Sequence, residues 1–469
     1  MQIKKVEVKN LFGYYSYKIK CTENRPITII HAPNGYGKTT VLKLIKSVLE
    51  LDFKSIYEIP IEKFTIEFYN GAIITIYKSG DFIKEKSNKD KLIKIRYIII
   101  HDEHSFDYEF TINDRTFEEI IEWGLKASLK RDFIRSRHLI DEDSGYKQVN
   151  DSYKMLCVLE ELLNTICSKS SLDINFIDSN RLFISNNQEI KFYNDRNISR
   201  RELDFIGSNK INLDTKNESS SMSESIIKYS SELLEIIADI RGKFANVSEA
   251  KERDFPNRLV EFVNESIKTE ETKESLNKDQ IIEKLSILET KREELEKLGL
   301  VLKGKTTTLP QDNNPNETML KFYTLYISDT EQKLQVFDGI KKKLELLLNI
   351  INTKTQFSNK RMRIDNKSGV IFEPINTNIK GKHIIPLEKL SSGEKHDFIL
   401  FYELIFKCDK NCIVLIDEPE ISLHVAWQME FINELSKICE MNGMQAIIAT
   451  HSPDIVNGNN DLLVSLGEE

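Results

Sequence analysis

Residues near the two ends of this 469-residue chain have the types and the spacing that phosphate chemistry requires. Near the amino terminus, residues 31–40 read HAPNGYGKTT, between an apolar run at 27–30 and a segment at 41–49 whose apolar residues recur at helical spacing. A strand, a loop that contains glycine and a helix are the context in which this pattern forms a phosphate-binding loop. The alternative is a glycine-rich turn that arose by chance, and the flanking elements disfavour it.

Each residue type in this loop has a physical role towards a bound phosphate. Gly35 and Gly37 let the backbone curl until successive N–H groups point inwards, and the helix that follows adds the positive end of its dipole. Lys38 is placed to reach the β- and γ-phosphates of a nucleotide, and the Thr39 hydroxyl to bind Mg²⁺. Ala32 stands where such loops usually have their first glycine, and we expect it to be tolerated if the backbone there stays at negative φ. The nucleotide-binding residues expected in this loop are Asn34, Gly35, Gly37, Lys38, Thr39 and Thr40.

A second set of chemical residues occurs near the carboxyl terminus. The segment LSSGEKH opens a helix, and its small, amide-rich start at Ser392 and Gly393 is a second seat for phosphate. The apolar run CIVLI then ends in two carboxylates, of which Asp417 is placed to hold Mg²⁺ and Glu418 to polarise an attacking water. A third strand pattern, QAIIAT, runs directly into His451, which is suited to contact a γ-phosphate. These features are individually weak signals, but together and in this order they are hard to produce by chance.

In this order of motifs the chain resembles the ABC-type ATPase heads of the SMC, RecF and OLD group. The resemblance covers residues 1–195 and 365–469 and leaves the helical middle unassigned. It implies that APNGYGKTT is the Walker A motif, LSSGE the signature motif and CIVLIDEP the Walker B motif. EISLH then marks the D-loop region, and ATHS carries the switch histidine. ATP and Mg²⁺ are the implied cofactors, with Glu418 and His451 as catalytic residues and Thr39 and Asp417 as metal ligands.

The fold predicted on these grounds is α/β, an ABC-type P-loop ATPase head assembled from N- and C-terminal lobes with an inserted helical or coiled-coil domain. The motifs for phosphate and for carboxylates lie on opposite flanks of the chain, yet they must meet around one Mg²⁺. We therefore expect an N-lobe with Walker A at 1–200 and a helical insertion at 201–365. The C-lobe, with the signature motif, Walker B and the switch histidine, is expected at 366–469.

Hydrophobic periodicity predicts the elements that must position these residues. The strongest local signal is a hairpin around Asn70 and Gly71, and another hairpin is expected within 2–20. Further strands are expected at 173–177, 370–372, 384–386 and 462–466, and helices at 117–130 and 155–167. The middle of the chain is expected to hold a flexible link at 208–225, a helical region at 226–300 that is interrupted near Pro256, and one long helix at 319–351.

Composition restricts the partners that the chain can have. A formal charge of −8 argues against a chain that coats DNA by itself, although basic clusters occur at 84–96, 131–138 and 196–201. No apolar run is long enough to span a bilayer and no signal peptide is recognisable, so we expect a cytoplasmic protein without a membrane partner. The six scattered cysteines fit thiols of a core. Arg181, just past a strand, is equally suited to face a phosphate or a neighbouring subunit and to make a surface salt bridge.

The phrases DEPEISLH and ATHSPDIV, with Gln428 between them, look most like the OLD-like ATPases of bacterial antiphage systems. Val425 replaces the proline that is usual in those relatives, and Gln148 is a Q-loop candidate by position only. A stand-alone ATPase of this size with a helical insertion is similar to the ATPase subunit of Septu defence systems, which works with a separate HNH nuclease. The ATPases of PARIS and of retron-associated systems compete closely, and the motifs do not separate them.

The resemblance therefore predicts an ATP-binding, slowly hydrolysing subunit that assembles with and regulates a separate nuclease and has no nuclease domain of its own. It implies a homo-oligomer, a dimer of heads in which Ser392 and Gly393 of one subunit complete the site that holds Lys38 of another. A larger ring or filament could form through the insertion, and the complex could contact DNA or RNA. The alternative is a RecF- or SMC-like DNA repair or clamp ATPase that binds DNA directly. A third possibility is a nucleotide-dependent scaffold without useful turnover.

Overall fold

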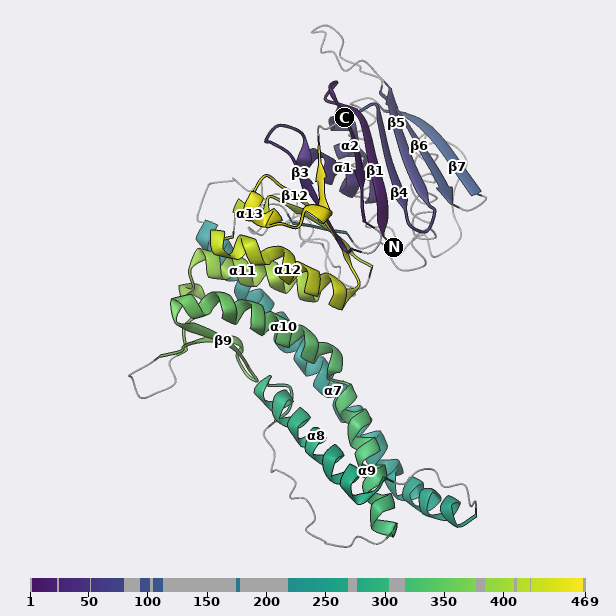
Figure 1. Cartoon of the computed structure of the whole chain (residues 1–469), viewed down its shortest axis with the longest axis vertical. Helices are drawn as coiled ribbons and strands as arrows, with labels where there is room; N and C mark the ends of the chain where they lie inside the picture. Colours follow the sequence, from purple (N-terminus) through teal and green to yellow (C-terminus); the bar gives the residue numbers. More distant parts are fainter. Residues whose placement is uncertain are drawn as a thin grey trace, which may run out of the picture. The chain divides into compact units, whose positions relative to one another are not determined.

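The computed structural model describes residues 2–22, 25–50, 52–79, 93–101, 104–112, 174–177, 218–268, 276–302, 317–376, 384–408, 411–421 and 423–466. The chain divides into two compact units, which Figure 1 shows in the colours of the sequence. Unit 1 consists of Met1–Leu182 and Lys407–Glu469, and unit 2 of Phe183–Phe406. This division differs from the predicted boundaries, because residues 366–406, with the signature serine and glycine, group with the helices of unit 2.

Several sequence predictions fall outside the described residues. They are the helices at 117–130 and 155–167, the candidate Gln148, Arg181 and the basic clusters at 131–138 and 196–201. Of the basic cluster at 84–96, only residues 93–96 are described.

The first sheet of unit 1 is antiparallel, and its described strands follow the order β2-β1-β4-β5-β6-β7 (purple to blue in Figure 1). The strands are β1 (Ile3–Leu11), β2 (Tyr15–Lys20), β4 (Lys63–Phe68), β5 (Ile73–Ser79), β6 (Ile93–His101) and β7 (His104–Ile112). Buried and less buried residues alternate strictly along β4, which is the period of two that burial of one face requires. Both predicted hairpins are confirmed, since β1 pairs with β2 and β4 pairs with β5 around Asn70 and Gly71.

The second sheet of unit 1 is parallel, in the order β13-β3-β12-β11-β8. Its strands are β3 (Ile27–His31), β8 (Ile174–Ile177), β11 (Ile413–Asp417), β12 (Gln445–Thr450) and β13 (Leu463–Ser465). Every residue of β11 and β12 is buried, which is why both strands are continuous apolar runs rather than alternating ones. Strands β3 and β11 come from opposite ends of the chain and both pair with β12. Their carboxyl ends therefore meet at one edge of the sheet.

The described residues of unit 1 also form α-helices. They are α1 (Lys38–Leu49), α2 (Phe53–Glu58), α12 (Val425–Asn442) and α13 (Pro453–Val456). The buried face of α1 contributes Val41, Leu44 and Val48 to the core that it shares with residues of both sheets. The buried side chain of Gln445 joins the two sheets, because its Oε1 accepts from the backbone N–H of Ile3 at 2.7 Å and its Nε2 donates to the carbonyl of Ile3 at 2.8 Å.

Unit 2 is built from long helices and one β-hairpin. Its elements are α7 (Glu218–Lys268), α8 (Lys278–Lys297), α9 (Glu317–Gln335), α10 (Asp338–Thr355), β9 (Lys360–Asp365), β10 (Gly369–Pro374) and α11 (Ser392–Tyr402). Helix α7 packs against α9 and α11, and α8 packs against α9 (Figure 1). Where α7 meets the hairpin, Ser230 Oγ accepts from the backbone N–H of Val370 at 2.9 Å. The predicted strand at 384–386 is only an isolated bridge between Phe372 and Ile385.

Three predictions for the middle of the chain are wrong. Residues 218–225, predicted as part of a flexible link, are helical and belong to α7. Pro256 does not interrupt that helix, and two residues later Arg258 holds Asp329 of α9 through two hydrogen bonds of 2.5 Å. The segment 319–351 is two helices, because Phe337 is fully buried between them. Its ring packs against that of Phe244, with 5.0 Å between the ring centroids. At Pro256 and at Phe337 a tertiary contact overrides the local signal.

The cysteines of the described residues agree with the prediction of core thiols. Cys21, Cys408, Cys412 and Cys439 are free and buried. Burial raises the pKa of the Cys21 thiol to about 11. In the described part of the chain, no helix combines the length and the apolar composition that a membrane crossing demands.

Candidate functional site

The loop between β3 and α1 has the backbone that a phosphate-binding loop needs. Gly35 and Gly37 have φ angles of +90° and +80°, and Gly37 is the N-cap of α1. A Cβ atom on Gly37 would lie 2.9 Å from Cδ2 of the buried Leu11, whereas one on Gly35 would meet no atom within 4 Å. Gly37 is therefore required by both its φ angle and its surroundings, and Gly35 by its φ angle alone. Ala32 is buried and is not among the described residues with positive φ, as expected for a tolerated alanine.

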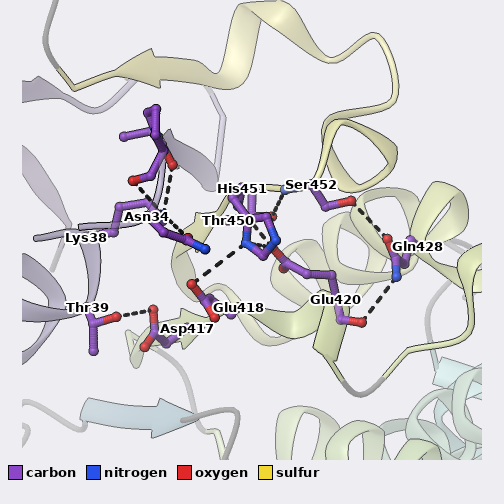
Figure 2. A network of polar contacts seen from close by, with 12 residues as sticks. Asn34, Lys38, Thr39, Asp417, Glu418, Glu420, Gln428, Thr450, His451 and Ser452 are labelled. Atoms are coloured by element: carbon purple, nitrogen blue, oxygen red, sulfur yellow. Dashed lines mark hydrogen bonds and ion pairs between the residues drawn. The ribbon is translucent and has the colours of Figure 1, made fainter. Parts of the chain in front are cut away.

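The Lys38 side chain folds back over this loop (Figure 2). Lys38 is 4% exposed, and its Nζ donates to the carbonyl oxygens of Ala32 at 2.8 Å and Pro33 at 3.3 Å. It also lies 3.4 Å from Oδ1 of Asn34. A buried ammonium group is costly unless acceptors surround it. The loop thus holds a positive charge at the position where the oxygens of a bound phosphate would need one.

Thr39 and Asp417 are 378 positions apart in the sequence and are in contact in the structure (Figure 2). The Thr39 hydroxyl donates to Oδ1 of Asp417 at 3.1 Å. Asp417 is the last residue of β11 and is 4% exposed. Thr40 lies one position further along α1 and is half-buried. A hydroxyl group from the loop helix and a carboxylate from the central sheet therefore meet at one point.

Glu418 follows directly and has an unusual backbone. Its φ of +46° is in the left-handed region, which costs a residue other than glycine about 1–2 kcal/mol. Its backbone N–H donates to the carbonyl of Ala449 in β12 at 2.8 Å. Figure 2 shows the Glu418 side chain pointing towards His451, with 3.8 Å between Oε1 and Nδ1. Strain of this kind is typical of functional sites, where the surrounding structure holds a side chain in one direction.

His451 lies just past the end of β12 and faces two carboxylates. Its Nδ1 is 3.0 Å from Oε1 of Glu420 and 3.8 Å from Oε1 of Glu418. Glu420 belongs to the short turn Pro419–Ile421, and its side chain is 7% exposed. The structure therefore brings together Lys38, Thr39, Asp417, Glu418 and His451, all predicted from the sequence.

The predicted signature residues belong to unit 2, whereas all the groups above belong to unit 1. Ser392 and Gly393 are exposed at the start of α11, after the N-cap Ser391. Ser391 and Glu394 form a capping box, in which the Ser391 hydroxyl accepts from the Glu394 N–H at 3.2 Å and the Glu394 carboxylate accepts from the Ser391 N–H at 2.8 Å. Burial by itself would raise the pKa of Glu394, but hydrogen bonds from Lys360 and from serines outweigh it and hold that pKa below its usual value. The capping box orders the start of α11, and the role of Ser392 and Gly393 stays a prediction.

Comparison with known proteins identifies the family. The family AAA_15, described as an AAA ATPase domain, matches residues 1–456 of this chain. The chain belongs to this family. The AAA ATPase domain therefore includes strands β3, β8, β11 and β12 of the parallel sheet and the residues gathered at its edge.

Two solved structures are similar at low identity. One is the SmcHead bound to the C-winged helix domain of ScpA, with 12% identity and a TM-score of 0.36, covering 100% of this chain and 95% of that chain. The other is the Smc head domain with a coiled coil and joint derived from Pyrococcus yayanosii, with 14% identity, a TM-score of 0.30 and the same coverage. At such TM-scores neither likeness bears on the function of this chain. No curated protein matches the sequence.

The residues of this AAA ATPase domain fit ATP with a divalent cation. The loop of positive-φ glycines and the buried Lys38 ammonium suit the phosphates. Within the described residues, no group of three or more His, Cys, Asp or Glu side chains could hold a metal ion. Mg²⁺ usually takes one or two carboxylates together with substrate phosphates, and Asp417 with the Thr39 hydroxyl matches that pattern.

Four residues of the network in Figure 2 were given no chemical role in the sequence analysis, although they lie within or between the motifs quoted there. They are Glu420, Gln428, Thr450 and Ser452. Gln428 Nε2 donates to the carbonyl of Glu420 at 3.2 Å, and its Oε1 accepts from Ser452 Oγ at 2.9 Å. The signal for these residues was their place in DEPEISLH and ATHSPDIV or between them. The second acidic residue in DEPE nevertheless reads as an ordinary turn residue until β12 is placed beside β11.

Proposed function

We propose that this AAA ATPase domain hydrolyses ATP at the edge of its parallel sheet, and that ATP binding and hydrolysis control a separate nuclease in a bacterial antiphage complex. One observation carries the proposal for the site. The Thr39 hydroxyl meets Asp417 at 3.1 Å, next to Glu418 and His451, although the chain separates Thr39 from all three by hundreds of positions. A structural core has no need to gather a hydroxyl, a buried carboxylate, a strained glutamate and a histidine at one edge.

Each residue has a task that its position supports. Lys38 and the loop amides bind the phosphates, and Thr39 and Asp417 would hold Mg²⁺, which when bound neutralises charge that develops on the transferred phosphoryl group. Glu418 accepts the proton of the attacking water as a general base. His451 donates a hydrogen bond to the γ-phosphate from the ring nitrogen that faces away from the glutamates. These assignments need no residue from outside unit 1 except the signature pair of a second subunit.

The control of a nuclease is supported by the resemblance and by the physics of such a site. DEPEISLH and ATHSPDIV look most like OLD-like ATPases of antiphage systems, and the ATPase subunit of Septu systems works with a separate HNH nuclease. A γ-phosphate that is held by two subunits links ATP binding to association, so slow turnover keeps an assembled state in place. A homo-oligomer of this kind is the expected platform for the nuclease subunit.

Steady-state hydrolysis with matched glutamate variants tests the site. Glu418→Gln should bind ATP as the wild type does and lose about 10²- to 10⁴-fold in kcat, because the amide is a poor base. Glu430→Gln, at an exposed glutamate of α12, is the control and should change neither quantity. Equal kcat values for Glu418→Gln and the wild type would show that the assignment is wrong.

The nuclease partner is tested by coexpression with the product of a neighbouring reading frame that bears an HNH signature. We expect the two chains to copurify, and nucleic-acid cleavage by the complex to differ between the wild type and Glu418→Gln. Absence of a complex would contradict this part of the proposal. Direct DNA binding by the isolated chain, with affinity that falls steeply as salt rises, would instead favour the RecF- or SMC-like alternative.

A further inference from the structure

Glu420 is buried beside the proposed hydrolysis site, although it is neither a nucleotide contact nor a metal ligand in that proposal. It lies in the turn Pro419–Ile421 that follows β11, and its side chain is 7% exposed. Among the described residues, its Oε2 atom is buried without a hydrogen-bond partner. A buried carboxylate is costly unless hydrogen-bond donors or an opposite charge stabilise it. The contacts of its other oxygen show which part of the site it serves.

Three donors converge on Oε1 of Glu420 (Figure 2). The Thr450 hydroxyl donates at 2.7 Å, the backbone N–H of His451 donates at 2.9 Å, and Nδ1 of His451 lies 3.0 Å away. All three come from the end of β12 and the residue after it. One oxygen atom therefore holds both the backbone and the ring of His451.

The ring of His451 depends on this oxygen for its direction. The His451 side chain is 42% exposed, so packing alone does not restrict its rotation. Oε1 already accepts from a backbone N–H, which can only donate, so Nδ1 of the ring takes the donor role towards it. Nδ1 therefore carries a proton, and Nε2 is the nitrogen that remains for a ligand, to which it donates when both ring nitrogens are protonated.

A second side chain strengthens the same connection. Gln428 donates from Nε2 to the backbone carbonyls of Glu420 at 3.2 Å and Leu423 at 3.1 Å. Its Oε1 accepts from the Ser452 hydroxyl at 2.9 Å, and the backbone N–H of Ser452 donates to the Thr450 hydroxyl at 3.0 Å. The turn after β11 and residues 450–452 are thus joined through side chains as well as through the strand pairing. Movement of the turn would be transmitted to the histidine.

We infer that Glu420 is a positioning residue, which fixes the ring direction and the proton position of His451 so that Nε2 faces the γ-phosphate. This inference rests on the proposed hydrolysis of ATP at this site. Glu418 and Glu420 then have different roles in hydrolysis. Glu418 is the general base for the water, whereas Glu420 acts only through His451.

Kinetics of single and double variants test the inference. Glu420→Gln should lower kcat by about ten- to a hundred-fold, the worth of hydrogen bonds to a charged group. The KM for ATP should stay within about two-fold, because Glu420 acts through His451 rather than on the phosphate-binding loop. Glu420→Asp keeps the charge on a shorter side chain, so it should recover part of the lost kcat. Glu430→Gln is the control for a glutamate that is exposed on the neighbouring helix.

The decisive comparison is made in the absence of the imidazole. In a His451→Ala background, Glu420→Gln should lower kcat by no more than about two-fold further, because its only route to the reaction is gone. If the two losses multiply instead, Glu420 does not act through His451 and the inference is overturned. Should Glu420→Gln fail to fold, Glu420→Asp takes its place in this cycle.

Nitrogen-15 spectra of labelled histidine provide a test that needs no turnover. The His451 signals are identified by their loss in His451→Gln, and we expect a protonated Nδ1 in the wild type and a mixture of protonation states in Glu420→Gln. An unprotonated Nδ1 in the wild type would overturn the inference. If the wild type hydrolyses no ATP, the proposed function fails, and these spectra still decide whether Glu420 holds the ring.

Discussion

Replacing Gly35 or Gly37 with alanine tests two requirements of the phosphate-binding loop separately. One is the positive φ angle of the backbone, and the other is the lack of space for a side chain. Gly37→Ala introduces a Cβ atom 2.9 Å from Cδ2 of Leu11 and 3.4 Å from Cε2 of Phe12. Gly35→Ala introduces the same atom into open space, at a φ of +90° rather than +80°. The two variants therefore share the cost of a left-handed alanine, and only Gly37→Ala adds a steric conflict.

The size of each effect follows from these contacts. A left-handed alanine costs about 1–2 kcal/mol, which is the whole loss of unfolding free energy expected for Gly35→Ala. Leu11 is fully buried in the core of unit 1, so it cannot move away freely, and overpacking adds about 1–3 kcal/mol for Gly37→Ala. The expected total for Gly37→Ala is about 2–5 kcal/mol.

Urea unfolding followed by tryptophan fluorescence measures the difference in the relevant unit, because both tryptophans, Trp123 and Trp427, fall within the residue ranges of unit 1. ATP binding by the folded variants is measured in parallel, and Gly37→Ala should lose more of it. Equal losses of stability in the two variants would refute the packing argument. A negligible loss in Gly35→Ala would refute the backbone argument.

Three further predictions concern the nucleotide site and unit 2. Lys38→Ala should weaken ATP binding, measured by titration with a fluorescent nucleotide, because it removes the charge opposite the β- and γ-phosphates; unchanged affinity would contradict the role of Lys38. Ser392→Arg should fold normally, since Ser392 is exposed, and should abolish hydrolysis. Mixing it with Lys38→Ala should restore some hydrolysis in mixed dimers, and the absence of recovery after proven subunit exchange would exclude a shared site. Burial lowers the pKa of His396 to about 4. Between pH 6.5 and 4 the unfolded chain therefore binds more protons than the folded chain, and unit 2 should lose about 3 kcal/mol of unfolding free energy as the pH falls through that range. Circular dichroism of His396→Leu should show a weaker dependence on pH, and an identical dependence would contradict the assignment.

Local patterns in the sequence were sufficient for the elements that carry chemistry. The loop of Gly35 and Gly37 is required by φ angles that glycine adopts readily, so it is readable within ten residues. The strand before Asp417 is readable because a strand buried on both faces needs a continuous apolar run. The hairpin around Asn70 and Gly71 follows from turn chemistry alone.

Local patterns failed where a distant contact outweighs propensity. Pro256 predicted a break that does not occur in α7, beside the ion pair of Arg258 and Asp329. No break was predicted near Phe337, where burial of its ring against Phe244 separates α9 from α10. A window of a few residues contains no information on such partners, which lie tens of positions away.

The sequence alone determined that a phosphate-binding loop, a pair of carboxylates and a histidine exist at the ends of three separate strands. Only the tertiary structure decided that they meet, because the order β3-β12-β11 brings Thr39 to Asp417 across 378 positions. The same strand order gives Glu420 its partners, since the turn after β11 reaches His451 only when β12 lies beside β11. Hydrogen bonds of this kind depend on the pairing of distant strands, and no local propensity encodes that pairing.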